Sequence, residues 1–472
     1  MNLWMALCML LPSFLALALG EKGNAQAFFT SSILTAFAGM GFLLAFRDCM
    51  APLSRRSAFL LPVNVFVLLP VFASLPFIFS NHYGGFSGAY FESVSALTTT
   101  GASIIVDPSI LGQSLLLWRG LLEWIGGFYT ILIALSVLSF LNVGGMQLLK
   151  VSLPHGSGQG MLSQMGVYAR VLMPLYASIT ALSTVFLMVT GENWADALTI
   201  SLTLTGTGGF SLYADGQVLN NNPSGELVVA IVLIIASASL LGLFNVARLK
   251  SIKSTDKREP LYLVLFTIIA AILFFNAHNN DIISGNLTEQ FRISFFQAAS
   301  AISTSGISAE GGSISTATGM FLTVVLLLIG GMATSSTGGV KLMRIIILFR
   351  HARRELRRLA HRHDATSINF DSRIVSEEDI ATVWLLFFAI ILTVGLATLL
   401  FSFMGYALHD SLGIALSSLM NAGPSVYNLA PNFESYLVMP TGGYELVLFL
   451  MILGRMELVF GLAIISKRFW QN

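Results

Sequence analysis

The sequence contains four short apolar segments that each end in a glycine among small polar side chains. The first reads LTTTGAS over residues 97–103, and its carbonyl and threonine oxygens are ligands that can replace water around an alkali cation. A row of carbonyls pointing the same way needs backbone angles that a Cβ penalises, which accounts for the glycine. The glycines of the four segments are Gly101, Gly208, Gly306 and Gly423. These segments predict oxygen-lined cation sites.

The composition places such sites in a membrane. Hydrophobic residues make up 55% of the 472 residues and charged residues only 10%, with a mean hydropathy of +0.78. These values lie outside the range of soluble domains, so we predict an integral membrane protein embedded in the lipid bilayer. The net charge of +1 argues against nucleic-acid binding. Two cysteines, Cys8 and Cys49, are too few for a disulfide framework.

Ten stretches come close to the roughly 20 apolar residues that a membrane-spanning helix needs. They are 3–19, 26–46, 59–79, 113–140, 171–190, 226–247, 260–276, 318–350, 380–405 and 445–466. If both termini are cytoplasmic, 21 of the 25 Lys and Arg residues fall in cytoplasmic segments, as the positive-inside rule requires. The other four are Lys22, outside, and Arg119, Arg292 and Arg455, near or within the membrane. We predict this orientation.

The glycine-containing segments are too short to span a membrane, and each lies between two spanning stretches. Their glycines are 107, 98 and 117 residues apart, so a unit of helix, half-helix and helix recurs along the chain. We therefore predict an all-α membrane protein with four pseudo-symmetric repeats around a central pore. The repeats cover 57–150, 165–250, 259–365 and 377–472, after an extra transmembrane helix pair at 1–46.

A single cluster of small polar residues could be no more than a helix-packing patch. Four copies favour a pore, because non-helical backbone at membrane depth must be buried in protein or line a water-filled cavity. The negative C-terminal ends of the half-helices would also favour a cation. On the predicted orientation, acidic residues gather on the outer side, where they would concentrate cations. They are Glu92, Asp107, Glu192, Asp196, Asp215, Asp281, Glu289, Glu310 and Asp410.

The stretch 318–350 is too long for one straight helix and is interrupted by GGMATSSTGGVK. In it, Gly330–Gly331 and Gly338–Gly339 flank a polar tract. One interpretation is a kink relieved by neighbouring helices, and the other is a flexible intramembrane loop beneath the cation sites. Arg455, within the last apolar stretch, is costly at membrane depth and implies a partner or a wet cavity. Glu457 or a nearby carbonyl would serve as that partner.

Six motifs stand out: FESVSALTTTGAS, TGTGGFS, ISTSGIS, WRGLLEWIGG, GGMATSSTGGVKLMR and GRMELVF. They resemble those of the Trk/Ktr/HKT superfamily of potassium transporters, TrkH-type bacterial subunits in particular, and the likeness extends over nearly the whole chain. The resemblance implies a selectivity filter formed by Thr99, Thr100, Gly101, Thr207, Gly208, Thr304, Ser305, Gly306, Asn421, Ala422 and Gly423. It also implies a gate formed by Gly330, Gly331, Thr334, Ser335, Ser336, Gly338, Gly339, Lys341 and Arg455.

The function implied by this resemblance is gated potassium uptake across the bacterial inner membrane, with potassium as the transported ion and no organic cofactor. A glycine in all four filters favours potassium over sodium. The implied partners are a second copy of the chain, in a homodimer, and a cytosolic TrkA-like nucleotide-binding ring. The basic segment 350–364 is either the docking element for that ring or an anchor lying against acidic lipid.

Other transport functions remain open. The chain could be the potassium-translocating subunit of an ATP-driven pump, or a sodium- or proton-coupled cation symporter. An unrelated secondary transporter with broken helices would have inverted repeats and ionisable residues at the midplane, whereas these four segments lie in parallel order without charges. The sequence has no nucleophile, metal-ligand or acid–base constellation, so we predict that the protein is not an enzyme.

Overall fold

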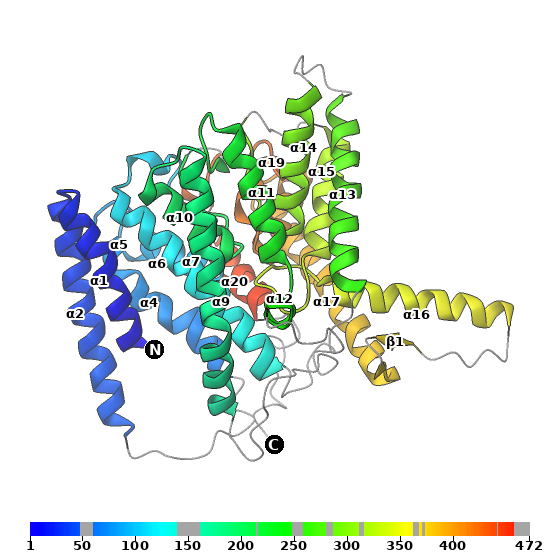
Figure 1. Ribbon diagram of the computed structural model, residues 1–472, viewed down its shortest axis with the longest axis horizontal. Coiled ribbons are helices and arrows are strands. Elements are labelled where there is room, and N and C mark those ends of the chain that lie inside the picture. Colours follow the sequence, from blue (N-terminus) through cyan, green and yellow to red (C-terminus); the bar gives the residue numbers. More distant parts are fainter. Residues whose placement is uncertain are drawn as a thin grey trace.

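The computed structural model contains long helices side by side, with shorter helices enclosed between them (Figure 1). It describes residues 1–47, 60–138, 161–213, 216–247, 258–279, 287–310, 316–361, 368–370, 373–440 and 442–456. The strands within these ranges are β1 (Asn369–Phe370) and β2 (Arg373–Ile374), which form a small antiparallel hairpin. The predicted all-α membrane fold is confirmed apart from this hairpin.

Two helices precede four units of similar organisation. The pair is α1 (Asn2–Ala18) and α2 (Lys22–Ala45). Each unit has a long helix, a short enclosed helix and a second long helix. In the first unit the first long helix is Leu60–Phe79, which includes η1 (Asn64–Leu68), α4 (Leu69–Ala73) and α5 (Leu75–Phe79). The short helix is α6 (Phe86–Leu97), and the second long helix is α7 (Gln113–Ile133), continued by η3 (Ala134–Leu138). The second unit has α9 (Met161–Val189), α10 (Trp194–Thr205), α11 (Pro223–Ser237) and α12 (Leu240–Ala247).

The third unit has α13 (Arg258–Asn279), α14 (Leu287–Ile302), α15 (Ala317–Ile329) and α16 (Leu342–Ala360). The fourth has α17 (Glu377–Phe403), α18 (Leu408–Leu419) and α20 (Gly443–Arg455). Short helices in the connections are η2 (Pro108–Ile110), η6 (Gly423–Ser425), α19 (Val426–Leu429) and η7 (Tyr436–Val438). The predicted repeats and their boundaries stay a prediction.

Six of the described helices are long and apolar enough to cross a membrane, or seven if α11 and α12 count as one bent span. Two of the predicted spans are not continuous helices. The stretch 318–350 is interrupted between α15 and α16, as expected, but 226–247 is also broken, with α11 and α12 meeting at 94°. Hydropathy did not reveal this second break, because it counts apolar side chains and does not register where the backbone turns.

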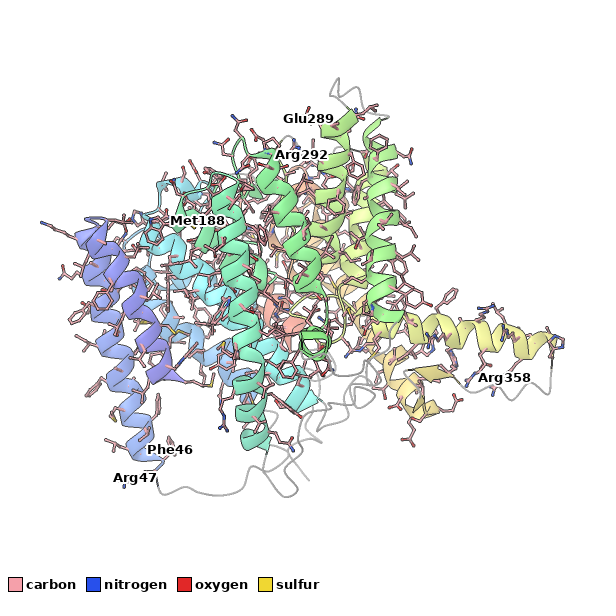
Figure 2. All side chains as sticks on the ribbon, viewed as in Figure 1. Phe46, Arg47, Met188, Glu289, Arg292 and Arg358 are labelled. Atoms are coloured by element: carbon pink, nitrogen blue, oxygen red, sulfur yellow. The ribbon has the colours of Figure 1, made fainter. Side chains whose placement is uncertain are left out.

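The distribution of side chains suits a membrane. Glu289 and Arg292 lie at one end of the bundle, and Arg47 and Arg358 lie toward the other (Figure 2). Between the ends, the long helices present large apolar side chains outward, such as Phe37 of α2, which is 81% exposed. Such surface is unfavourable in water and matches a hydrocarbon environment.

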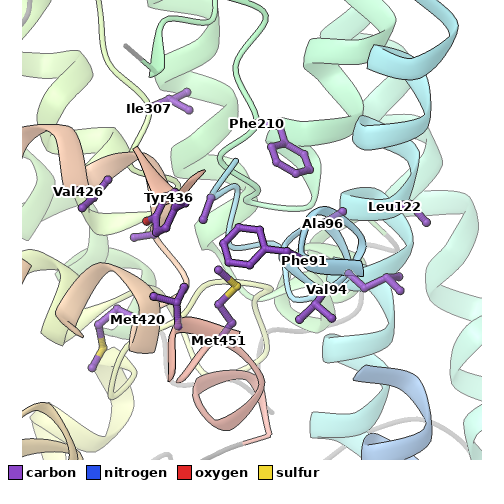
Figure 3. Packing of buried hydrophobic residues seen from close by; sticks show 14 of the residues in the cluster. Phe91, Val94, Ala96, Leu122, Phe210, Ile307, Met420, Val426, Tyr436 and Met451 are labelled. Carbon is purple, nitrogen blue, oxygen red and sulfur yellow. The ribbon is translucent and has the colours of Figure 1, made fainter. Parts of the chain in front are cut away.

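All four units contribute to the core around the short helices (Figure 3). Phe91, Phe210, Ile307 and Val426 come from the first to the fourth unit in turn, and all are buried. Phe91 packs against the Tyr436 ring with centroids 5.5 Å apart. Because lipid is as apolar as these side chains, close packing rather than escape from water holds such helices together.

Glycines let α7 approach the short helices closely. A Cβ on Gly126 would overlap the carbonyl oxygen of Leu97, at the end of α6. A Cβ on Gly127 would lie 2.7 Å from the Cα of Gly206, just after α10. Small residues at helix contacts in membranes allow this approach, so the backbone of α7 lies directly against two of the four helix ends.

The N-terminal pair is attached to the start of α7. Glu21, in the turn between α1 and α2, accepts a hydrogen bond from the backbone N–H of Gln113 at 2.8 Å and another from the Ser114 hydroxyl. The free N–H groups at a helix N-terminus favour an anionic partner of this kind. The extra pair therefore helps to position α7.

Candidate ion pathway

The short helices α6, α10, α14 and α18 end in the same way. The second residue after each helix is left-handed although it carries a side chain: Thr99 (φ 50°), Thr207 (53°), Thr304 (56°) and Asn421 (55°). The N–H of the following residue donates to a carbonyl five residues earlier at 2.8–3.2 Å: Thr100 to Ser95, Gly208 to Thr203, Ser305 to Ser300 and Ala422 to Ser417. This is a Schellman-type ending, which turns the chain sharply. Left-handed residues other than glycine are uncommon. Because all four helices share this rare conformation at the same place, the four residues occupy equivalent positions.

Counting from these residues sets the register of the four non-helical segments that follow, which we call strands below although they are not β-strands. In the first, third and fourth units the glycine comes two residues after the left-handed residue; these glycines are Gly101, Gly306 and Gly423. In the second unit that place belongs to Gly209, not to the predicted Gly208. The sequence offers two consecutive glycines, and only the end of α10 decides between them.

The four strands converge at these glycines. A Cβ on Gly101 would overlap the Cα of Gly209. A Cβ on Gly209 would lie 2.6 Å from the carbonyl oxygen of Ser305 and 2.6 Å from the ring of Pro424. One residue of the second strand thus touches the other three strands, and the absence of a side chain permits that approach.

The threonine oxygens of the first strand have different environments. The Thr100 carbonyl accepts a hydrogen bond from Gly423 N–H at 2.6 Å, and its hydroxyl accepts one from the Asn421 amide at 2.9 Å. The Thr100 hydroxyl is also 2.7 Å from that of Thr98. The buried Thr99 hydroxyl has no hydrogen-bond partner in the part of the chain that the structure describes. Thr99 is therefore the better candidate for an oxygen ligand.

A small cavity adjoins the strands beyond the glycines. Its volume is about 10 Å³, which is room for about one water-sized particle. It is lined by residues of the first, second and fourth strands and the loops that follow them, including Ala102, Ser103, Ser211, Gly216 and Tyr436. Within the described ranges no group of three or more His, Cys, Asp or Glu residues could hold a metal ion. The oxygens that the strands offer are those of the backbone and of hydroxyl and amide side chains.

Residues 330–341, between α15 and α16, lie against the strands where these leave the short helices. The Thr207 hydroxyl donates to the Ser336 hydroxyl at 3.0 Å. The Gly338 N–H donates to the Thr304 hydroxyl at 2.7 Å. Both threonines are the left-handed residues of their units, and the loop is buried as far as residue 338. The segment is thus a buried non-helical loop rather than a simple kink, and it contacts the ends of the second and third strands.

Two cationic side chains hold this loop. Arg455 of α20 donates to the Ser336 carbonyl oxygen, while Glu457, the alternative partner, lies outside the described residues. The Lys341 ammonium donates to the Ser335 carbonyl at 3.3 Å and to the Thr337 hydroxyl at 3.0 Å. Both charges are buried next to loop oxygens, as charged groups at membrane depth require.

The loop is also bound to elements that the sequence did not indicate. At the break between α11 and α12, the Ser239 and Thr334 hydroxyls are hydrogen-bonded, and Leu240 N–H donates to the Thr334 carbonyl at 3.4 Å. At the start of α13, Glu259 accepts a hydrogen bond from Ala333 N–H at 3.2 Å. The small polar residues within an otherwise apolar span, SAS at 237–239, are the signal that could have identified this contact.

The predicted outer acidic residues are not all at the surface. Glu92 is completely buried and forms an ion pair of 3.0 Å with Arg119, and Asp410 is buried as well. Neither carboxylate can concentrate cations at a mouth, because each is taken up by protein contacts. Asp215 and Asp281 lie outside the described residues.

Short helices that end at a common centre, irregular strands between them and an apolar surround are typical of membrane proteins that pass ions. The model of the TrkH family, described as a cation transport protein, matches residues 24–468. The chain belongs to the TrkH family of cation transport proteins, and as predicted it is a transport protein rather than an enzyme.

Named relatives cover almost the whole chain. It is 31% identical to the Trk system potassium uptake protein TrkH of Salmonella typhimurium, over 98% of this chain and 96% of the relative. The Escherichia coli K12 protein of the same name is 30% identical over the same shares. The crystal structure of the potassium transporter TrkH from Vibrio parahaemolyticus matches with a TM-score of 0.89 at 25% identity, covering 100% of this chain and 97% of that one.

Proposed function

We propose that this protein takes up potassium ions across the bacterial inner membrane, through the centre of the four strands. The observation that carries the proposal is that four equivalent helix ends bring glycine-containing, uncharged strands to one centre. Helix C-termini bear partial negative charge, and strand oxygens can replace the hydration shell of an alkali cation. The named relatives, all potassium uptake proteins or transporters, support potassium as the ion.

The proposed filter is the set of strands after the left-handed residues. It comprises Thr99, Thr100, Gly101, Thr207, Gly208, Gly209, Thr304, Ser305, Gly306, Asn421, Ala422 and Gly423. The convergence at Gly209 supports this assignment. The Thr99 hydroxyl, which has no hydrogen-bond partner among the described residues, adds an oxygen where the first strand leaves α6. We expect the filter to distinguish ions by the number and spacing of these oxygens.

The proposed gate is the loop 330–341 together with Arg455. The loop contacts the ends of the second and third strands directly, so an ion cannot pass there unless the loop moves. The guanidinium and the ammonium that hold the loop also repel a passing cation, since the repulsion is strong where the effective dielectric constant is low. The loop therefore blocks the pathway by its contacts with the strands, and the two cationic side chains oppose passage by their charge.

Helix α16 supports a role for a cytosolic partner. It points away from the bundle (Figure 1), and Leu359 near its end is 86% exposed. Beyond its midpoint it is attached to the start of α17 through Arg354, whose guanidinium binds the Glu377 carboxylate at 2.8 and 3.2 Å. Because α16 directly follows the gate, a TrkA-like nucleotide-binding ring bound to it would pull on the loop. The homodimer and the cytoplasmic location of both termini belong to the same proposal.

Ion flux into liposomes tests the proposal. Purified protein is reconstituted, and the uptake of potassium, rubidium, sodium and lithium is compared with that of empty liposomes. We expect potassium and rubidium flux well above that of lithium. The absence of potassium flux both with and without a loop deletion would refute the function. Potassium flux that requires a proton or sodium gradient would instead identify a symporter.

A further inference from the structure

Three buried charged side chains lie behind the first two filter strands. Glu92 comes from α6, and Arg119 and Glu123 come from successive turns of α7. Each residue is at most 1% exposed. Buried charges are costly unless they are paired and hydrogen-bonded, so their contacts show what they stabilise.

Glu123 belongs to the first unit but holds the strand of the second. One oxygen of its carboxylate accepts hydrogen bonds from the backbone N–H groups of Gly209 at 3.0 Å and Phe210 at 3.1 Å. A Cβ on Gly208 would overlap this carboxylate. Two backbone donors on one carboxylate oxygen hold the second strand at the glycine where the four strands meet.

Arg119 lies between Glu92 and Phe210, one of the two residues that Glu123 holds. Its guanidinium pairs with Glu92 at 3.0 Å and lies over the Phe210 ring, 4.0 Å from the centroid. The attraction between a cation and an aromatic face strengthens when both are removed from water. Phe210 is thus held by its N–H through Glu123 and by its ring through Arg119.

Glu92 holds the first strand in turn. It accepts a hydrogen bond from the Ser103 hydroxyl at 2.9 Å and from the Ile104 N–H at 3.3 Å. These residues follow Gly101, whose Cα approaches Gly209 so closely that no side chain fits between them. The first and second strands, which touch each other, are therefore each hydrogen-bonded to a carboxylate. Arg119 joins the two sets of contacts, because it pairs with Glu92 and lies over Phe210.

We propose that Glu92, Arg119 and Glu123 form a filter clamp that positions the first and second strands and so sets the discrimination between potassium and sodium. This inference rests on the proposed transport function. Next to their glycines the other two strands have neutral contacts: the Ser300 hydroxyl donates to the Ile307 carbonyl at 2.7 Å, and the Tyr436 hydroxyl to that of Gly423 at 3.5 Å. A carboxylate, that of Glu226, reaches the third unit only farther along, at the N–H of Glu310. Two of the four strands therefore owe their position to buried ionisable side chains. Loss of these contacts loosens the ring and favours smaller ions.

Glu123→Gln is the first test, because glutamine keeps the shape and one acceptor oxygen but removes the charge. In liposomes we expect the potassium-to-sodium permeability ratio to fall about tenfold, the factor that corresponds to weakening the two hydrogen bonds by about 1.4 kcal/mol together. Glu123→Ala should lower the ratio further. Arg119→Lys keeps a positive charge near Glu92 but loses the planar contact with Phe210, so a smaller fall is expected.

Glu226→Gln is the matched control. Glu226 is also buried, is ion-paired with an arginine (Arg292) and accepts a backbone N–H, that of Glu310 at 2.8 Å, but it touches no filter strand. This variant should keep the permeability ratio of the parent. A fall of the same size in the control would show that the ratio reports general loosening, and would overturn the clamp.

A second readout does not depend on conduction. Potassium that binds the folded filter raises the melting temperature relative to sodium, and this difference should shrink in Glu123→Gln. If the alanine variant does not fold, the glutamine variant decides. A selective parent with an unchanged ratio and an unchanged melting difference in Glu123→Gln refutes the clamp while the proposed function stands. An absence of potassium flux both in the parent and in the loop deletion refutes the function instead.

Discussion

Replacing Arg455 with alanine tests whether the loop is held shut by this side chain. Arg455 is 6% exposed, and its guanidinium donates to the Ser336 carbonyl within the loop. A hydrogen bond from a charged group contributes about 1.5–3 kcal/mol. Since about 1.4 kcal/mol corresponds to a factor of ten, the ratio of closed to open loop should fall about 10- to 100-fold. Loss of the guanidinium also removes its repulsion of a passing cation.

The assay is potassium flux into liposomes without any regulatory partner, where the parent should be nearly closed. Arg455→Ala should raise this basal flux by about tenfold or more, in keeping with the loss of a charged hydrogen bond. Arg455→Lys should stay close to the parent if charge alone matters. Arg292→Ala is the control, since Arg292 lies far from the loop, at the end of the bundle near Glu289 (Figure 2).

The lysine variant separates two physical causes. If it conducts like the alanine variant, the forked hydrogen bonding of arginine to the loop is the important property, because lysine presents a point charge without that geometry. Should alanine abolish flux in protein that is folded and inserted, the barrier reasoning is wrong and Arg455 has a structural or activating role. A rise of equal size in Arg292→Ala would also refute it.

Two further substitutions and one deletion test the pathway. Gly101→Ser should lower the potassium-to-sodium permeability ratio, because the position has φ of 72° and a side chain would overlap Gly209; an unchanged ratio would remove Gly101 from the filter. Deletion within 332–337 should raise basal flux at least as much as loss of the arginine, and a folded deletion that conducts no better than the parent would show that the loop is no obstruction. Ser239→Ala removes the hydroxyl partner of Thr334 and should raise basal flux about fivefold, for a hydrogen bond of about 1 kcal/mol; a stopped-flow flux measurement that finds no change would exclude the α11–α12 break from the gate.

The membrane location and the recurring helical unit could be predicted from the sequence because they depend on short windows of residues. A composition of 55% hydrophobic residues identifies the solvent without any knowledge of neighbours. The recurrence of the glycine segments is also visible in short windows of sequence. The interruption of the helix after residue 329 could be predicted from the local sequence GGMATSSTGGVK. In each case the signal and the structure lie in the same few residues.

The details of the pathway were decided by contacts between distant residues. Gly209 rather than Gly208 aligns with Gly101 because the end of α10 sets the strand register. The sequence identified Thr99 and Thr100 as oxygen donors but not that the oxygens of Thr100 are engaged by the fourth strand, 321 residues away at Asn421. Hydrogen-bond partners across such separations leave no pattern in one sequence.

The buried charged residues show most clearly which features follow from the sequence and which depend on tertiary contacts. From the sequence, Glu92 is an outer acidic residue and Arg119 a basic residue near the membrane, and nothing marks Glu123 as a partner of the second strand. The carboxylate of Glu123 reaches Gly209 across 86 residues, because glycines bring α7 against the ends of α6 and α10. Residue type and local periodicity determine where helices form and which surfaces are apolar, whereas the environment of a charge depends on which helices pack together, and that is a property of the tertiary structure alone.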